Sequence, residues 1–224
     1  MMKSSLFFRA IGKLLMGLLL LALLLFLPAW TLHYPQAWLF LGILFIPMIL
    51  VGIVLFVKSP ELLEKRLDAK EAESEQRTVV ALSGLMFLAA FILAGLSFRF
   101  GWLMLPFPVS IAAAVVFLAG YAMYAEVLRE NTYLSRTIEV QEDQKVIDTG
   151  LYGVVRHPMY LATVILFLSM PLILGSVISF LIMLFYIPII AKRIRNEEQV
   201  LEEGLPGYPE YKEKVKNRLI PFLW

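Results

Sequence analysis

Long stretches without a charged side chain dominate this sequence and predict helices that cross a membrane. No Asp, Glu, Lys or Arg occurs between Lys13 and Lys58, and shorter uncharged stretches lie between Arg77 and Arg99, Arg99 and Glu126, and Arg156 and Lys192. Each is at least as long as the roughly 20 apolar residues that a spanning helix needs. The pattern predicts an all-α fold, a polytopic integral membrane helical bundle of about five to six transmembrane segments.

The first uncharged stretch is long enough for two helices, and a polar break predicts where the chain turns. His33, Tyr34 and Pro35 interrupt it, so spans are expected at about 13–32 and 36–57. Two further spans are expected at about 79–98 and 107–128, the second ending in the polar run from Glu126 to Asp148. We expect these four spans to form an N-terminal region over residues 1–128.

The last uncharged stretch predicts a tight helical hairpin. It runs from His157 to Ala191, and Pro171 and the pair Gly175–Ser176 interrupt it. Two helices fit this length only if both are short. Because a hairpin returns the chain to the side where it started, the polar segments before and after it should lie on one side of the membrane. Residues 129–224 are therefore expected to form a second region of polar loop, helical hairpin and cytoplasmic C-terminal tail.

The distribution of basic residues predicts the orientation in the membrane. The turns at 33–38 and 99–108 contain only Arg99, whereas nearly all other Lys and Arg residues lie in the segments 1–13, 58–78, 129–156 and 192–218. The positive-inside bias then places both termini in the cytoplasm. The small size and the lack of a targeting extension lead us to expect a bacterial or archaeal inner membrane.

Composition supports a membrane protein and excludes several kinds of site. The 224 residues are 60% hydrophobic and 17% charged, whereas soluble proteins are about 25% charged. The chain has no cysteine, which excludes disulfides, thiol nucleophiles and thiolate metal sites. Only His33 and His157 are present, without an H-E-x-x-H spacing, so we predict no metal site.

A first candidate cluster of polar residues precedes the hairpin. Gly150 permits a close backbone approach or an unusual backbone angle. Pro158 suits the first turn of a helix, which places Arg156 and His157 where free backbone N–H groups and the helix dipole favour an anionic ligand. Alternatively, the Gly and Pro residues only shape a loop-to-helix junction and Arg156 reaches to the lipid headgroups.

A second candidate cluster follows the hairpin. Arg193 and Glu197 are four residues apart and therefore share one helix face, and Tyr208 and Tyr211 come shortly after them. Taken alone, this segment is better explained as a solvated helix exit that obeys the positive-inside bias. Because the predicted hairpin brings both clusters to the same side, we expect them to converge on one interfacial site.

Together the two clusters resemble the signature halves of the isoprenylcysteine carboxyl methyltransferase (ICMT) family, which includes related phospholipid methyltransferases. The first half, G-x-Y-x-x-V-R-H-P-x-Y, is matched by Gly150, Tyr152, Val155, Arg156, His157, Pro158 and Tyr160. The second half is matched by Arg193, Ile194, Glu197, Glu198, Leu201, Tyr208, Tyr211 and the terminal R-L-I-P of residues 218–221. The resemblance covers about 140–224; two additional prolines near Tyr208 and the additional N-terminal hairpin depart from it.

The resemblance implies S-adenosylmethionine as cofactor and methyl transfer to a lipidic or hydrophobic acceptor, most like carboxyl O-methylation of an isoprenylcysteine-type substrate. It implies that Arg193, braced by Glu197, orients the acceptor carboxylate. Arg156 or nearby backbone amides would hold the cofactor carboxylate, and Glu198 its amino group. His157 and Tyr160 would line the purine or ribose side. The full implied cofactor set is Gly150, Tyr152, Val155, Arg156, His157, Pro158, Tyr160, Glu198, Tyr208 and Tyr211.

Other functions remain open at the level of the sequence. With a phospholipid amine as acceptor, Glu197 would serve as general base. An NADPH-dependent membrane reductase of the sterol-reductase type has a similar C-terminal membrane architecture. A non-enzymatic membrane scaffold would use the polar clusters only to anchor helices. Membrane lipids are expected partners, and nucleic acid is not.

Overall fold

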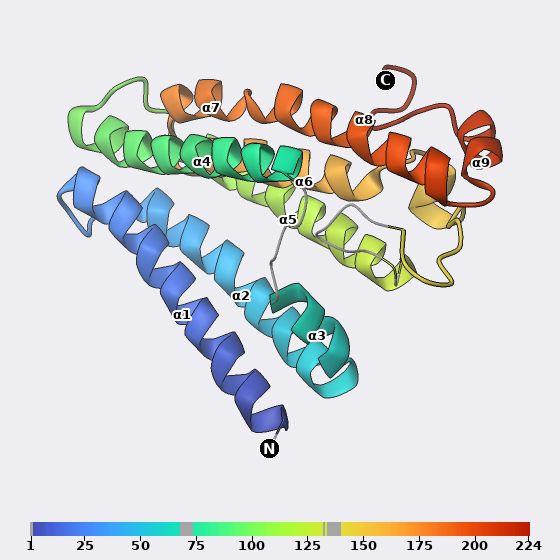
Figure 1. Cartoon of the computed structure of the whole chain (residues 1–224). Helices are drawn as coiled ribbons and strands as arrows, with labels where there is room; N and C mark the ends of the chain where they lie inside the picture. Colours follow the sequence, from blue (N-terminus) through green and yellow to red (C-terminus); the bar gives the residue numbers. More distant parts are fainter. Residues whose placement is uncertain (1, 68–73, 132, 134–139) are drawn as a thin grey trace.

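Helices make up the regular structure of the computed structural model, which describes residues 2–67, 74–131, 133 and 140–224. Among these residues there is no strand beyond an isolated bridge between Met104 and Ser176. The elements follow one another as labelled in Figure 1: α1 (Met2–Ala29), α2 (Pro35–Lys58), α3 (Pro60–Leu67), α4 (Ser74–Phe100), α5 (Phe107–Glu130), η1 (Gly150–Gly153), α6 (Pro158–Ile173), α7 (Val177–Met183), α8 (Tyr186–Gly204) and α9 (Tyr208–Lys214).

Five of the described helical segments are long and apolar enough to cross a membrane. They are α1, α2, α4, α5 and the continuous segment Val177–Gly204, which joins α7 to α8. A sixth apolar helix, α6, has 16 residues. The predicted all-α membrane bundle is confirmed.

The first hairpin turns where the sequence predicts, but its first helix is longer than expected. α2 begins at Pro35, whose fixed φ suits the first helical turn. The turn is closed by the indole N–H of Trp38, which donates to the carbonyl of Leu32 at 2.8 Å. α1 begins at Met2 rather than near residue 13, because no helix-breaking residue separates the basic N-terminal segment from the apolar run.

The segment after α2, expected only to be polar, contains the short amphipathic helix α3. Pro60 occupies its first position, as prolines at helix starts commonly do. Leu63 is buried, while Glu61 and Glu64 are exposed. α3 therefore presents an apolar side to α1 and α2, which it contacts.

The predicted helical hairpin near the C-terminus is present, but only its first arm, α6, is short, because α7 and α8 together form the 28-residue segment Val177–Gly204. α6 ends at Ile173, and Gly175 turns the chain with a φ of +74°, a left-handed angle that glycine adopts without strain. The side chain of Ser176 then caps α7 by accepting from the N–H of Ser179 at 3.2 Å. Pro171 lies within α6 instead of ending it.

Buried hydrogen bonds fix the tip of this hairpin to the rest of the bundle. The hydroxyl of Tyr34 donates to the carbonyl of Leu174 at 2.6 Å. The N–H of Leu105 donates to the carbonyl of Gly175 at 2.8 Å, and Ser179 donates to the carbonyl of Ala90 at 2.7 Å. These contacts join α2, α4 and the turn before α5 to the hairpin. They thereby also fix the position of the N-terminal end of α6, where the polar clusters lie, relative to the other helices.

The shortness of α6 sets the depth of the candidate site. At 1.5 Å per residue, its 16 residues span about 24 Å, less than the roughly 30 Å of a bilayer core. We therefore expect the N-terminal end of α6 to lie below the level that a full spanning helix would reach. Charged groups at that depth must be satisfied by other protein groups.

Candidate functional site

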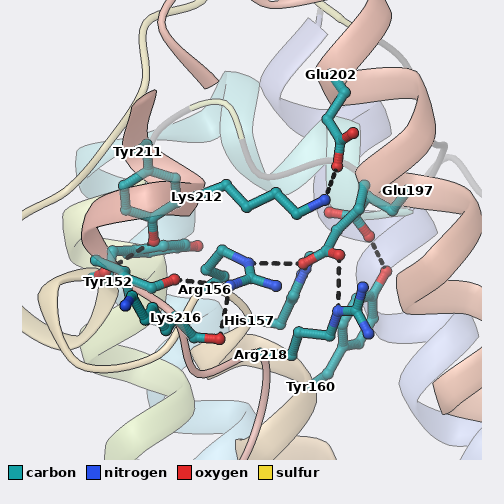
Figure 2. Close-up of polar contacts among 12 residues, drawn as sticks. Tyr152, Arg156, His157, Tyr160, Glu197, Glu202, Tyr211, Lys212, Lys216 and Arg218 are labelled. Carbon is teal, nitrogen blue, oxygen red and sulfur yellow. Dashed lines mark hydrogen bonds and ion pairs between the residues drawn. The ribbon is translucent and has the colours of Figure 1, made fainter. Parts of the chain in front are cut away.

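Four segments converge at the N-terminal end of α6. They are the loop with η1, the start of α6, the middle of α8 and the tail that follows α9 (Figure 2). The η1 loop, the middle of α8 and the tail belong to the polar regions expected before and after the hairpin, and the start of α6 is the first turn of the hairpin itself. The predicted convergence of the two clusters is confirmed by their hydrogen bonds.

Glu198, on α8, is the centre of a buried ion cluster. Its side chain is only 3% exposed. One carboxylate oxygen accepts from Arg156 Nε at 2.7 Å and lies 3.2 Å from His157 Nε2, and the other accepts from Arg218 Nε at 2.8 Å. Buried charges persist only when they are paired and hydrogen-bonded, so these side chains stabilise one another as a unit.

The tail folds back over the start of α6 and uses its backbone donors. The N–H groups of Arg156 and His157 donate to the carbonyls of Asn217 and Arg218, both at 2.9 Å. Arg156 Nη1 also donates to the carbonyls of Val215 at 2.7 Å and Lys216 at 2.9 Å. Residues 215–218 of the tail therefore cross the end of α6 and are hydrogen-bonded to it, and we call them the strap.

These contacts give Arg156 and Glu198, both predicted to hold the cofactor, partners within the protein. The backbone amides expected to hold a ligand carboxylate are bonded to the tail. Glu198, expected at the cofactor's amino group, is already surrounded by protein cations. The sequence could not show this, because the contacts join residues about 20 to 60 positions apart without any periodic pattern. The placement of Arg156 and Glu198 in a cofactor site stays a prediction.

Arg193 and Glu197 are joined through a third residue, Tyr160. Arg193 Nε donates to the Tyr160 hydroxyl at 3.0 Å, and that hydroxyl donates to Glu197 Oε2. Both α8 side chains are half-buried, whereas Tyr160 is buried, and its ring stacks near His157 with centroids 5.7 Å apart. The expected bracing of Arg193 by Glu197 therefore includes a tyrosine that the sequence analysis had assigned only to the cofactor.

Gly150 has both the unusual backbone angle and the close approach that the sequence suggested, and the group that approaches it is a protein carboxylate. Its φ is +48°, and a Cβ there would lie 2.2 Å from a carboxylate oxygen of Glu130. Glu130, at the end of α5, accepts from the Thr149 hydroxyl at 2.9 Å and from the Leu151 N–H at 3.3 Å. The glycine lets this carboxylate fasten the η1 loop to α5.

The tyrosines complete the wall of the site. The Tyr211 hydroxyl donates to the carbonyl of Tyr152 at 2.7 Å, and the Tyr152 hydroxyl accepts from Asn131 Nδ2 at 2.9 Å. The hydroxyl of Tyr208 is buried and has no hydrogen-bond partner among the described residues. Burial, reinforced by the charges of Glu198 and Glu197, raises the pKa of Tyr208, so its hydroxyl stays protonated and able to donate.

A pocket of about 100 Å³ opens between these elements. The predicted site residues that line it are Tyr152, Arg156, His157, Tyr160, Arg193, Glu197, Tyr208 and Tyr211. Gly150, Val155, Pro158 and Glu198 are not among the lining residues. Lining residues that were not predicted from the sequence include Asn131, Tyr133, Gln144, Lys145, Val146, Ile147, Met159 and Leu205. Met159 occupies an unspecified position of the first motif, and the others lie outside both motifs.

Comparison with known proteins confirms the resemblance and the fold. Residues 109–203 match the sequence model of the isoprenylcysteine carboxyl methyltransferase (ICMT) family. A solved structure of the eukaryotic intramembrane Ras methyltransferase ICMT superposes with a TM-score of 0.55 at 19% identity, covering 91% of this chain and 74% of that one. The Delta(14)-sterol reductase TM7SF2 of Mus musculus is 30% identical over 91 residues. That match takes in 39% of this chain but only 22% of the reductase.

Proposed function

From the premise that residues 109–203 form an ICMT-type region on an ICMT-like membrane fold, we propose that this chain is an S-adenosylmethionine-dependent membrane methyltransferase. Its acceptor is a lipidic or hydrophobic molecule at the cytoplasmic membrane face, and the reaction is most like carboxyl O-methylation of an isoprenylcysteine-type substrate. The observation that carries the proposal is the hydrogen-bonded set Arg193–Tyr160–Glu197, which lines the pocket.

The donors and acceptors of the pocket suit the cofactor chemically. S-Adenosylmethionine is a sulfonium cation, and carboxylates and aromatic faces attract cations. Glu197 and the tyrosines of the wall supply both. The buried Tyr208 hydroxyl is a donor in need of a partner, as a ligand acceptor atom would provide. Ligand pockets usually measure about 300–1,000 Å³, so the 100 Å³ pocket has to widen when the cofactor binds.

The proposed reaction needs positioning more than proton transfer. When bound, S-adenosylmethionine would supply an electrophilic methyl group for an acceptor oxygen. Arg193 would hold the acceptor carboxylate through its planar guanidinium. Tyr160 and Glu197 keep that guanidinium in place. A carboxylate acceptor is already anionic, so no base is required, and a pocket poor in water favours its attack.

Glu197 allows a second acceptor class at the same site. A lipid amine must lose a proton before it can attack, and Glu197 is the carboxylate that lines the pocket. A phospholipid amine should therefore be tested as a methyl acceptor alongside a carboxylate.

A reductase is the second candidate function, favoured by the 30% identity to a Delta(14)-sterol reductase. Such a protein would bind NADPH in place of S-adenosylmethionine. The short coverage of that relative, 22% of its length, makes this the weaker proposal.

Calorimetric titration of the detergent-purified protein separates these proposals. We expect saturable binding of S-adenosylmethionine and of its demethylated product, and none of NADPH. Binding of NADPH alone would favour the reductase. A folded preparation that binds none of the three would favour a non-enzymatic scaffold. With cofactor binding established, labelled-methyl transfer to a farnesylated cysteine and to phosphatidylethanolamine identifies the acceptor class.

A further inference from the structure

A second cavity, separate from the candidate site, lies among α1, α2 and α3. Its volume is about 510 Å³, within the range of ordinary ligand sites. Phe7 and Leu14 on α1, Met48 and Phe56 on α2, and Leu63 and Leu67 on α3 contribute to its wall. Among the described residues, Lys13 is the only charged one in its lining, and none of them also lines the polar pocket. We call it the α1–α3 groove.

Polar contacts keep the α1–α3 groove open by tying α3 to α1. Arg9 forms an ion pair with Glu64 at 3.3 Å, and the Lys13 ammonium donates to the carbonyl of Leu67. At the same end, the rings of Phe7 and Phe56 join α1 to α2, with centroids 5.8 Å apart. Figure 1 shows α3 beside α2, close to the N-terminal end of α1. The groove therefore has a polar end, at the start of α1, and an apolar interior.

The interior reaches well into the apolar part of the bundle. Met48 and Phe56 both line it and are eight residues apart on α2, which corresponds to about 12 Å along the helix axis. Gly52 lies between them and also lines the groove; a Cβ added there would meet nothing within 4 Å. Such a slot accommodates a flexible hydrocarbon chain.

The polar end is positively charged. Among the described side chains, Arg9 and Lys13 lie at this end, one helical turn apart on α1, and Glu64 is the carboxylate that pairs with Arg9. Juxtamembrane basic residues attract anionic lipid headgroups by about 1 kcal/mol each. Lys13 stands at the boundary, because it lines the apolar groove and its ammonium carries three donors. A ligand with an apolar tail and a negative head matches this arrangement.

We propose that the α1–α3 groove binds an anionic membrane phospholipid, with an acyl chain between α1 and α2 and the headgroup beside Lys13. The site is independent of the methyltransferase proposal, since it shares no residue with that pocket. The experiment that tests it therefore measures how much lipid the purified protein retains, and not methyl transfer.

Native mass spectrometry of the purified protein, titrated with phosphatidylglycerol or phosphatidylcholine of the same acyl chains, tests the proposal. Gly52→Leu places a side chain in the groove and should weaken phosphatidylglycerol binding by about tenfold, as expected for displacing roughly two methylene groups. Gly42→Leu is the matched control. It lies on the same helix, also has nothing within 4 Å of an added Cβ, and does not line the groove.

Lys13→Gln tests the headgroup separately. Glutamine keeps an N–H donor for the Leu67 carbonyl but removes the charge, so phosphatidylglycerol binding should fall by about fivefold while phosphatidylcholine binding is unchanged. Equal retention of the two lipids by the unaltered protein would overturn the proposed headgroup preference. Equal effects of Gly52→Leu and Gly42→Leu would overturn the groove as the site. Formation of a dimer that Gly52→Leu abolishes would assign the groove to a second copy instead.

Discussion

The N-terminal hairpin and the α6–α8 region are held together by different forces. Within an apolar stretch of 18 residues in each span, only 11% of the residues are buried within the protein in α1 and 17% in α2. The corresponding share is 28% in the segment that joins α7 to α8. α1 and α2 therefore expose apolar side chains to lipid, with which they make non-directional contacts. The end of α6 is instead fixed by directional hydrogen bonds around Glu198.

This difference predicts where substitutions should be tolerated. Lipid is as apolar as a leucine side chain, so exchanges on the exposed faces of α1 and α2 lose little. The polar groups near the end of α6 have no such substitute, because each unsatisfied group in an apolar environment costs free energy. The largest effects of substitution should come from the ion cluster and the smallest from the lipid-facing hairpin.

The largest loss of stability is expected for Glu198→Ala. It leaves Arg156, His157 and Arg218 without their shared carboxylate, and removing one partner of a buried ion pair costs about 3–5 kcal/mol. The free energy of unfolding in detergent measures it. Glu202→Ala is the control, because Glu202 pairs with Lys212 at the surface, where an ion pair contributes about 0–1 kcal/mol. Similar losses for the two variants would contradict the buried cluster.

Arg193→Ala and Glu197→Ala should reduce methyl transfer by roughly 100- to 1,000-fold, as loss of one positioned charged group does in other enzymes. Both side chains are half-buried, so folding should be retained. Arg195→Ala provides a control on the same helix, since Arg195 is exposed and does not line the pocket. Arg193→Lys should restore little, because an ammonium lacks the planar fork. Full turnover by either alanine variant would remove these residues from the site.

Tyr160→Phe should have an intermediate effect. It keeps the ring but removes the hydroxyl between Arg193 and Glu197, and hydrogen bonds to charged groups contribute about 1.5–3 kcal/mol. We expect a roughly tenfold or greater fall in kcat/KM for the acceptor, with cofactor affinity nearly unchanged. A variant that instead loses only cofactor affinity would assign Tyr160 to the cofactor, as the sequence alone suggested.

Gly150→Ala should cost about 1–2 kcal/mol of stability, the usual penalty for a left-handed backbone angle at a residue with a side chain. The added Cβ also meets the Glu130 carboxylate. Combining Gly150→Ala with Glu130→Ala removes that contact but not the backbone strain. The double variant should therefore cost less than the sum of the two single ones, and strict additivity in thermal unfolding would exclude a contact between them.

The smallest effect on activity is expected for substitutions that fill the α1–α3 groove. Gly52→Leu should change lipid retention without changing methyl transfer, because Gly52 lies outside the candidate site. Parallel assays of bound lipid and turnover on one preparation measure both. Equal losses of lipid retention and methyl transfer would indicate that the α1–α3 groove and the candidate site are coupled.

Much of the fold could be predicted from the sequence, because it depends on local signals. Uncharged stretches identify the spans, and Gly175 with Ser176 identifies the hairpin turn. α3 was missed, since eight residues are too few for a clear periodic signal.

The site could be predicted only in part. Its location follows from the hairpin, and its residue types follow from two motifs. The strap of residues 215–218, the bridge through Tyr160 and the contact of Glu130 with the η1 loop are tertiary. Such contacts depend on how distant segments pack, which spacing along the chain does not encode.

The most direct test of the central claim is labelled-methyl transfer from S-adenosylmethionine to a farnesylated cysteine by the purified protein in lipid vesicles, with Arg193→Ala and Arg195→Ala measured alongside. We expect base-labile label on the acceptor, formed by the unaltered protein and by Arg195→Ala but reduced at least about 100-fold in Arg193→Ala. Label that forms equally in both variants would contradict the proposed site. A folded protein that binds the cofactor but labels neither the farnesylated cysteine nor the vesicle lipids would contradict methyl transfer to a lipidic acceptor.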